Sequence, residues 1–265
     1  MAEFDESLNS VRIKSFKLMD YKMGEIYMIG VHHRDSDVAR KLEEVFDRVH
    51  PDLILNETSA DFVEFERLNR ECMAMVFASK NVSPVVVSSL LEKAALLGHE
   101  LEASQSYATR CGIEQDFLND QGRPLDEELI DYQKQCSDLA DILTINPGFV
   151  NARFEAVVES VNSSLMNVSQ FVIPNLGTPK EEEIFKLLDS DIADPAMNWE
   201  RDAKMEATLR QARERLGDDA NIVTVTGLAH LIRTKVLHTF YSRVLDLNPK
   251  RVFLLGSIVY EGETS

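Results

Sequence analysis

The sequence predicts an α/β fold with a central, mostly parallel sheet, built from two similar halves and a helical insertion. Three observations lead to this prediction. A strand–helix–strand pattern occurs near each end of the chain, a Gly-x-x-His motif follows the first strand of each pattern, and a long helical region separates them. Gly30 precedes Pro51 by 21 positions and Gly227 precedes Pro249 by 22. This shared spacing indicates an internal repeat.

The first half begins near the amino terminus. Residues 11–20 alternate apolar and polar side chains, as a half-buried strand does. The run "EIYMIG" predicts a strand that ends at Gly30, and apolar side chains at helical spacing predict a helix over 38–49. Pro51 ends that helix, and "DLILNE" predicts a buried strand that ends at Glu57. Strand, helix and strand together are the unit of a parallel sheet.

The middle of the chain is mainly helical. The pattern is helical from Ala60 to about Gly112, and "IEQDFL" then predicts a short strand. Residues 121–195 are expected to form a helical insertion or cap within a single α/β domain over 1–265. The segment "NWERDAKMEATLRQARERLG" predicts a further helix, which ends at Gly217.

The second half repeats the first. The segment "NIVTVTGLAH" predicts a strand and its turn, and "RVFLLG" predicts the closing strand after Pro249. Between them a helix is expected, with its apolar positions at Leu231, Val236, Leu237, Phe240 and Val244.

Composition excludes several classes of function. The 265 residues carry 45 acidic and 28 basic side chains, a formal charge of −17, which disfavours binding to nucleic acid or to anionic membranes. No segment has the roughly 20 apolar residues of a membrane span, and the acidic start "MAEFDESLNS" is not a signal peptide. Three cysteines without a C-x-x-C pair predict reduced thiols and a cytoplasmic location. The sequence is compatible with a homodimer.

The two motif histidines and one glutamate form the candidate site. His33 and His230 each follow a strand, and Glu57 ends the strand paired with the first. Loops at the carboxyl ends of parallel strands form the ligand crevice of such sheets, so the three side chains can converge. Two imidazoles and one carboxylate are a common ligand set for a catalytic divalent metal such as zinc, manganese or cobalt. A single Gly-x-x-His is more simply a strand end with a hydrogen-bonded histidine, and Glu57 is either a ligand or a helix-capping carboxylate.

Other polar residues have simpler interpretations. His32 is expected beside the site or in solvent, and His50 and His238 are expected to be structural or solvated. His99 and Glu100 are neighbours on a helix and point about 100° apart. The segment "NWERD" is typical of a salt-bridged helix start. The chain contains no H-E-x-x-H, G-x-S-x-G or P-loop motif.

In the order of its motifs the chain resembles the TraB family of pheromone-shutdown proteins, in the superfamily of the Tiki metalloproteases and the erythromycin-esterase-like proteins. The resemblance rests on "GVHHRDSDV", "PDLILNET", "GHELEASQSYATRCG", "NWERDAKM" and "TGLAHL", in that order over residues 26–245. It implies paired α/β halves and a divalent-metal site with His33, Glu57 and His230, with Glu100 and Arg201 beside it.

The chain also departs from the family pattern. Asn119 and Asp120 stand where the family has an Asp-Arg pair, and His32 stands where it has a small residue. Many members carry a hydrophobic carboxyl-terminal part, whereas this sequence ends at Ser265 without one.

Two functions are open from the sequence. The first is a metal-dependent hydrolase that cleaves a peptide or related amide, with Glu100 as general base, Arg201 as stabiliser of the oxyanion or of a substrate carboxylate, and Glu200 as the next candidate base. The second is a non-catalytic regulator that binds a peptide or small ligand in the same crevice. Both need the same pocket.

Overall fold

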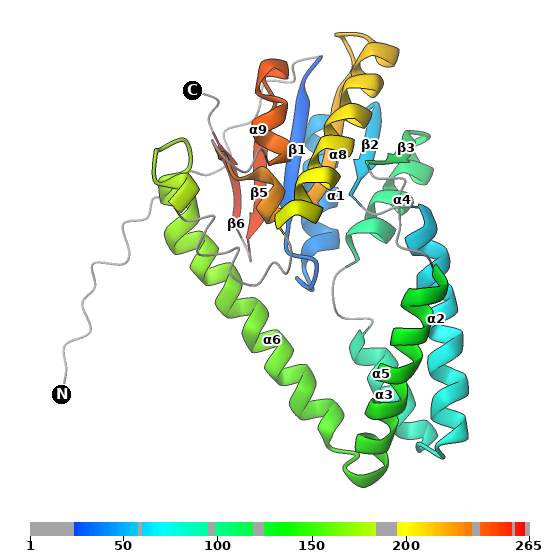
Figure 1. Cartoon of the computed structure of the whole chain (residues 1–265). Helices are drawn as coiled ribbons and strands as arrows, with labels where there is room; N and C mark the ends of the chain where they lie inside the picture. Colours follow the sequence, from blue (N-terminus) through cyan, green and yellow to red (C-terminus); the bar gives the residue numbers. More distant parts are fainter. Residues whose placement is uncertain are drawn as a thin grey trace, which may run out of the picture.

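The protein is a central sheet with helices on both faces and a group of long helices beyond one edge (Figure 1). The computed structural model describes residues 24–57, 60–94, 99–118, 125–183, 195–234, 239–255 and 258–262. The strand expected over 11–20, His238, and the Asn119–Asp120 pair lie outside these residues.

Within the described residues, the sheet has six strands in the order β3-β2-β4-β1-β5-β6. The first five strands in this order are parallel, and the edge strand β6 is antiparallel to β5. This confirms the predicted α/β class. The strands are β1 (Ile26–Val31), β2 (Leu53–Asn56), β3 (Glu114–Phe117), β4 (Ile222–Gly227), β5 (Lys250–Leu255) and β6 (Ile258–Gly262).

The two Gly-x-x-His strands are neighbours. β1 pairs with β4 in parallel, with Gly30 opposite Thr226 and Val31 opposite Gly227. The predicted closeness of the two motifs is therefore confirmed. The halves interleave, because β4 lies between β1 and β2 while β1 lies between β4 and β5.

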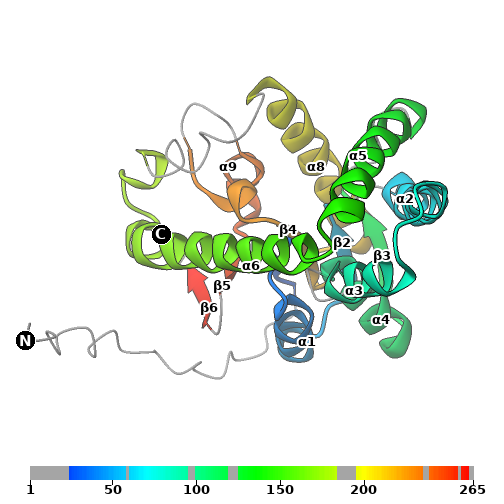
Figure 2. The same ribbon diagram turned by 90° about the horizontal axis from the view of Figure 1, so that it is seen from below.

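The connections of the two halves cover opposite faces of the sheet. Figure 2, which views the sheet along its strands, shows α1 and α4 on one side and α8 and α9 on the other. Phe46 and its apolar neighbours on α1 pack against Ile29 and Ile54, while Met205 and Leu209 of α8 lie in the core on the other face. The halves are thus related by an approximate two-fold axis along the strands. The bounds are α1 (Val38–Val49), α4 (Glu100–Cys111), α8 (Pro195–Leu216) and α9 (Phe240–Arg243).

The described helices in the connection of the second half are shorter than the predicted helix. In place of one helix, the chain forms a 3₁₀ turn, η5 (Leu228–Leu231), and later the four-residue α9, and a second 3₁₀ turn, η6 (Leu245–Leu247), follows α9. The backbone leaves the first turn at Ile232 in an extended conformation. Thr239 is the N-cap residue of α9, and its side chain accepts a hydrogen bond from the backbone N–H of Ser242. Val236 and Leu237 lie outside the described residues.

Four helices form a cap beyond the carboxyl ends of the strands. Helices α5 and α6 come from the predicted insertion, and α2 and α3, which precede α4, pack against them. Figures 1 and 2 show α6 crossing beneath the ends of the strands. No described helix has both the length and the apolar character that crossing a membrane requires. The bounds are α2 (Ala60–Ser79), α3 (Pro84–Ala94), α5 (Leu125–Ile145) and α6 (Phe149–Asn167), with short turns η2 (Val168–Val172) and η3 (Ile173–Asn175) after them.

Candidate active site

Three strand ends bring His33, Glu57 and His230 together. β2, β4 and β1 lie side by side in parallel, so their carboxyl ends share one edge of the sheet. Glu57 extends β2 by one residue, because its backbone N–H donates to the carbonyl of Val225 at 2.9 Å. Its carboxylate oxygens then lie 3.2 Å from Nε2 of His230 and 3.9 Å from Nε2 of His33. The three predicted residues therefore form one cluster.

Glu57 is the centre of this cluster. Its side chain is buried, and its Oε2 accepts the backbone N–H of Gly227 at 2.5 Å. Its Oε1 pairs with the guanidinium of Arg201, which α8 brings from the other face. The carboxylate thus receives one backbone group and three cationic or polar side chains, which is more than a helix-capping role requires.

The glycine that ends β4 provides the space for this arrangement. A Cβ atom at Gly227 would lie 2.9 Å from Nε2 of His33 and 3.5 Å from Oε2 of Glu57. The backbone at Gly227 has φ −60° and ψ 148°, which any residue can adopt. Glycine is therefore needed here for close approach and not for an unusual turn. At Gly30 a Cβ would instead press on Leu228 and Leu231, at 3.1 Å from each.

Each motif histidine is oriented by a carboxylate on its other nitrogen. Nδ1 of His33 donates to Oε1 of Glu100 at 2.7 Å, and Nδ1 of His230 donates to Oδ1 of Asp202 at 2.5 Å. Both Nε2 atoms are consequently turned toward Glu57. Histidines held in this way have a fixed ring orientation, and the pattern is common around metals and in acid–base sites.

Asp202 is the residue of this cluster that the sequence interpretation missed. Its side chain is 5% exposed, and it lies in line with the buried positions Met205, Leu209 and Ala212 of α8. An acidic residue at a position of the apolar stripe was the signal that could have found it. The predicted Glu200 lies two positions earlier, about 200° around the helix, and its side chain is exposed. The structure brings Arg201 to the site but not Glu200.

The charges of the cluster shift one another's pKa values. Burial alone would raise the pKa of Glu57, but His230, Arg201 and His33 hold it well below its usual value. Burial would lower the pKa of His230, but Glu57 and Asp202 raise it to about 10. Burial likewise opposes a shift at His33, whose pKa is raised by its hydrogen bond to Glu100 and by the charge of Glu57. In this geometry His230 is protonated near neutral pH, and His33 keeps its proton to a higher pH than a free imidazole does.

The donor atoms fit a divalent cation in their chemistry. A cation would use Nε2 of His33, Nε2 of His230 and the carboxylate of Glu57, and each imidazole has a carboxylate on its Nδ1. In the geometry described, Arg201 pairs with the carboxylate of Glu57, and the raised pKa values of His33 and His230 favour a proton on each imidazole. Among the described residues, no group of three or more His, Cys, Asp or Glu side chains is spaced to hold a metal ion. Cation binding must therefore release protons and displace Arg201 from Glu57.

Buried ion pairs fix the two loops that carry the histidines. In the first loop, Nζ of Lys41 lies 2.6 Å from Oδ2 of Asp35, and Lys41 is 1% exposed. The second loop is held by Glu181, whose carboxylate accepts a hydrogen bond of 2.6 Å from the backbone N–H of Arg233, just after the second motif. The same carboxylate pairs with Arg251. Each loop is therefore tied to the body of the domain by a charged hydrogen bond removed from water.

The remaining described histidines lie away from the cluster centre. The backbone N–H of Arg34 donates to Nδ1 of His32 at 3.3 Å, and burial, followed by the charge of His33, lowers the pKa of His32. His99 pairs with Glu102, whereas Glu100 faces His33. The two side chains thus have different partners, but His99 is the N-cap residue before α4 and does not lie on the helix as expected. His50 ends α1 in a left-handed conformation, near the amino ends of the strands.

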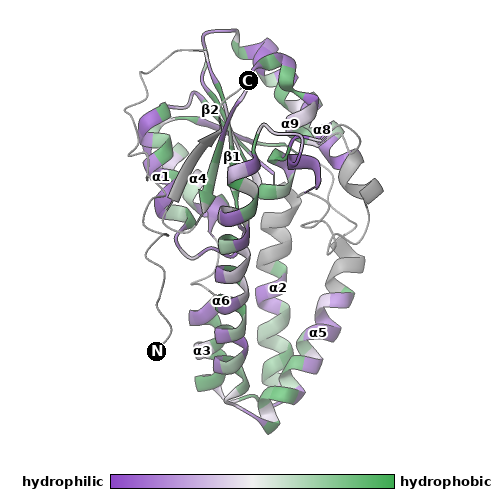
Figure 3. Cartoon of the chain, turned by 90° about the vertical axis from the view of Figure 1, so that its left-hand side faces the viewer, coloured by the Kyte–Doolittle hydropathy of each residue, from purple (hydrophilic) through white to green (hydrophobic). Residues whose placement is uncertain are grey.

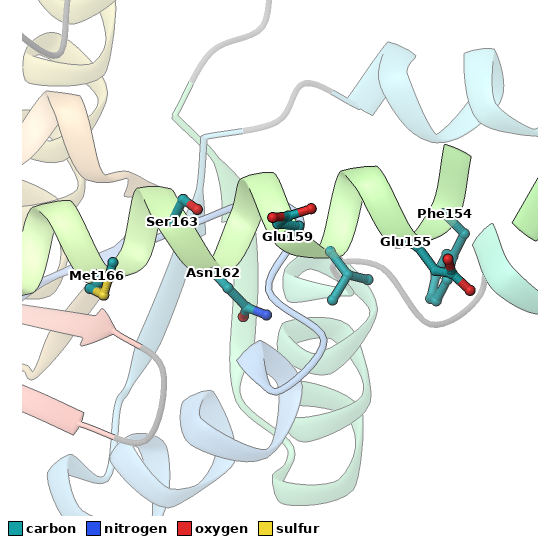
Figure 4. A pocket seen from close by; sticks show the side chains of 7 residues that line it. Phe154, Glu155, Glu159, Asn162, Ser163 and Met166 are labelled. Carbon is teal, nitrogen blue, oxygen red and sulfur yellow. The ribbon is translucent and has the colours of Figure 1, made fainter. Parts of the chain in front are cut away.

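A shallow apolar depression of about 390 Å³ runs along α6 and shares no residue with this cluster. Figure 4 shows its lining side chains on successive turns of that one helix, among them Phe154, Glu159 and Met166. Because one helix supplies all of its lining, we do not assign the active site to it.

The cluster of His33, Glu57, Glu100, Arg201, Asp202 and His230 is thus defined by its own geometry. It contains two carboxylate–imidazole pairs that meet at a third, buried carboxylate. No protein-family model, no curated protein and no solved structure matches this chain in the three comparisons.

Proposed function

We propose that the protein hydrolyses peptide or related amide bonds, with a divalent cation held by His33, Glu57 and His230. The observation that supports this proposal is the convergence of two Nε2 atoms on one carboxylate while both Nδ1 atoms are held by other carboxylates. When bound, such a cation polarises a carbonyl and lowers the pKa of a coordinated water. The resemblance to the TraB family implies the same ligand set, and relationship to that family is part of the proposal.

Glu100 is the proposed general base. It is the most accessible of the three carboxylates, with 17% of its side chain exposed against 6% for Glu57 and 5% for Asp202. Its hydrogen bond to Nδ1 of His33 keeps it beside the ring at the mouth of the cluster. A carboxylate that solvent can reach is able to take a proton from an attacking water.

Arg201 is the proposed electrophilic residue. Its side chain is 37% exposed, and one nitrogen of its guanidinium pairs with Glu57. Released from Glu57, the guanidinium can donate two hydrogen bonds to an oxyanion or to a substrate carboxylate. His230 and Asp202 are buried and hold the inner wall of the site in place.

Cation titration followed by peptide assays tests this proposal. Calorimetry with Mn²⁺, Co²⁺ and Zn²⁺ should show one site, with an affinity that rises with pH because bound protons are released. Removing either imidazole, by His33→Ala or His230→Ala, should weaken the cation by about 100-fold or more. His50→Asn is the matched control, since asparagine tolerates the left-handed conformation at that remote position.

The enzymatic part of the proposal needs its own measurement. The cation-loaded protein should cleave members of a peptide library, and a chelator should abolish cleavage. Equal cation affinity in wild type and in all three histidine variants would reject the ligand assignment. Cleavage that survives the chelator and the loss of both histidines would reject the site itself.

The second candidate is a non-catalytic module that binds a ligand carboxylate. The observation that favours it is that His33, His230 and Arg201 surround a single carboxylate, that of Glu57. Short peptides with a free carboxyl terminus should then bind at least tenfold more tightly than their amidated forms, and mass spectrometry should find them uncleaved. Cleavage of the bound peptide would exclude this alternative.

A further inference from the structure

The cap ends in a compact surface far from the candidate active site. We define the cap tip as residues 72–91 and 139–152, which contain the turn between α2 and α3 and the turn between α5 and α6. Figure 1 shows this end of the cap pointing away from the sheet. Val82 at the first turn belongs to the same apolar cluster as Leu143 and Val150 beside the second turn. The two turns are therefore packed together at the end of the cap.

The cap tip exposes large aliphatic side chains to solvent. Met75 is 67% exposed, Val85 77%, Ile142 41% and Ile145 86%. They come from α2, α3 and α5, and each lies within about two helical turns of one of the hairpin turns. Figure 3 shows the lower ends of these helices coloured mainly as hydrophobic. Grouped exposure of this kind marks an interaction surface more often than isolated apolar residues do.

The cap tip is also nearly free of charge. In a chain whose residues are 28% charged, the cap tip contains only Lys80 and Asp141. These two residues pair with each other, with Nζ of Lys80 lying 2.7 Å and 2.9 Å from the two carboxylate oxygens of Asp141. The net charge of the cap tip is therefore zero, whereas the whole chain carries −17.

We propose that the cap tip is the interface of a homodimer. Two copies of a chain with charge −17 repel each other when acidic surfaces approach, and the neutral cap tip lets them meet without that cost. A two-fold contact places the same patch on both sides, so Lys80 of each copy can face Asp141 of the other. A bilayer is the less favoured occupant, because the cap tip has no Trp or Tyr and only one basic residue.

Contact through the cap tips gives the dimer a definite form. The cap extends beyond the carboxyl edge of the sheet, and its tip is the end most distant from the strands (Figure 1). Two chains joined there form an elongated particle with the two sheets at opposite ends. Its frictional ratio should be clearly higher than that of a compact side-by-side dimer of the same mass.

Sedimentation velocity between about 1 and 100 µM tests the proposal and involves neither metal nor substrate. Wild type should sediment as an elongated dimer. Ile145→Glu and Val85→Glu should each weaken the dimer by at least about 100-fold, because each places a charge in an apolar contact. Ile130→Glu is the matched control: it makes the same change on α5, at a position that is 67% exposed but 15 positions before Ile145.

Three results would overturn the proposal. They are a wild type that remains monomeric at 100 µM, a dimer that survives both changes at the cap tip, and a dimer that Ile130→Glu disrupts equally. Circular dichroism should show that the variants keep the wild-type fold, since all three positions are exposed. A monomeric wild type that co-sediments with phosphatidylcholine vesicles, and loses this binding in Ile145→Glu, would assign the cap tip to a lipid surface instead.

Discussion

The carboxylate of Asp202 lies 2.5 Å from Nδ1 of His230, although Asp202 lies on α8 and His230 lies in the turn η5 that follows β4. Both side chains are buried, so the pair has little water to replace a lost partner. The ring of His230 is therefore held from behind while its Nε2 faces Glu57. This contact connects the stability of the domain with the geometry of the candidate site.

Removing Asp202 should destabilise the protein. Asp202→Ala leaves the protonated, buried His230 with one carboxylate in place of two, and breaking such a pair costs about 3 kcal/mol. Urea denaturation should show this loss in the free energy of unfolding. Glu200→Ala, on the exposed side of the same helix turn, should change it by less than about 0.5 kcal/mol. Similar losses in both variants would contradict the pairing of Asp202 with His230.

Stability should depend on pH through His230 and Glu57. The folded pKa of His230, about 10, lies above the ordinary 6.5, so its contribution is complete below pH 6.5 and is lost as pH rises through about 10. The folded pKa of Glu57 lies well below 4.5, so its contribution is present above pH 4.5 and is lost as pH falls through the folded value.

The variant His230→Gln isolates the alkaline part of this dependence. The difference in unfolding free energy between wild type and His230→Gln should be largest near pH 6 and should shrink steadily toward pH 10. Thermal or urea unfolding at several pH values measures it. A difference that is constant over this range would show that the pKa of His230 is not raised by folding.

Gly227→Ala should separate site geometry from stability. The added Cβ meets Nε2 of His33, which is the end of a half-exposed side chain that can turn aside. We therefore expect a loss below about 1 kcal/mol in unfolding free energy but a 10- to 100-fold loss in cation affinity. Gly148→Ala is the control, since its Cβ would meet only Asn146, at 3.4 Å. Wild-type affinity in Gly227→Ala would show that His33 does not bind the cation.

Glu100→Gln should distinguish catalysis from binding. The amide keeps the size of the side chain and can still accept the hydrogen bond from His33, but it cannot take a proton from water. In a hydrolase that uses Glu100 as base, turnover should fall by roughly 100- to 10,000-fold while cation content persists. Full turnover in this variant would remove Glu100 from the mechanism and leave the cation site untouched.

The sheet edge and its three central residues could be predicted because their signals are local. Buried strands such as "EIYMIG" and "DLILNE" end abruptly in the sequence, and parallel strands place those ends on one edge. His33, Glu57 and His230 therefore followed from strand ends alone. Their adjacency depended on the matching frames of the two halves, and the pairing of β1 with β4 confirms it.

Asp202 could not be assigned from motif spacing because its role depends on the rotation of α8. It shares the buried stripe with Met205, and only the packing of that stripe decides which of three consecutive charged residues faces the sheet. The second connection was predicted as a helix because Leu231, Phe240 and Val244 are apolar at helical spacing. In the structure all three side chains are buried, but they come from short turns and α9. Their apolar spacing therefore reflects burial and resembles the periodicity of a single helix only by coincidence.

Local sequence patterns could not predict which helices make up the cap. Residues 121–195 were expected to form a helical insertion or cap, and α2 and α3, which precede α4 and β3 in the chain, complete the apolar cluster of that cap. Phe77 and Leu143 meet in that cluster from separate segments. Long-range pairings of this kind leave no periodic trace in either segment.

The interleaved order of the strands has a consequence for how the molecule assembles. Met28 is flanked in the sheet by Thr224 and Arg251, which follow it by 196 and 223 positions. During synthesis the first strand therefore has no neighbour until almost the whole chain has left the ribosome. The cap and the β2–β3 pair can form earlier, but the middle of the sheet closes last. Because His33 and His230 follow β1 and β4, these two imidazoles meet only when the middle of the sheet has closed, so the candidate site is among the last features of the molecule to form.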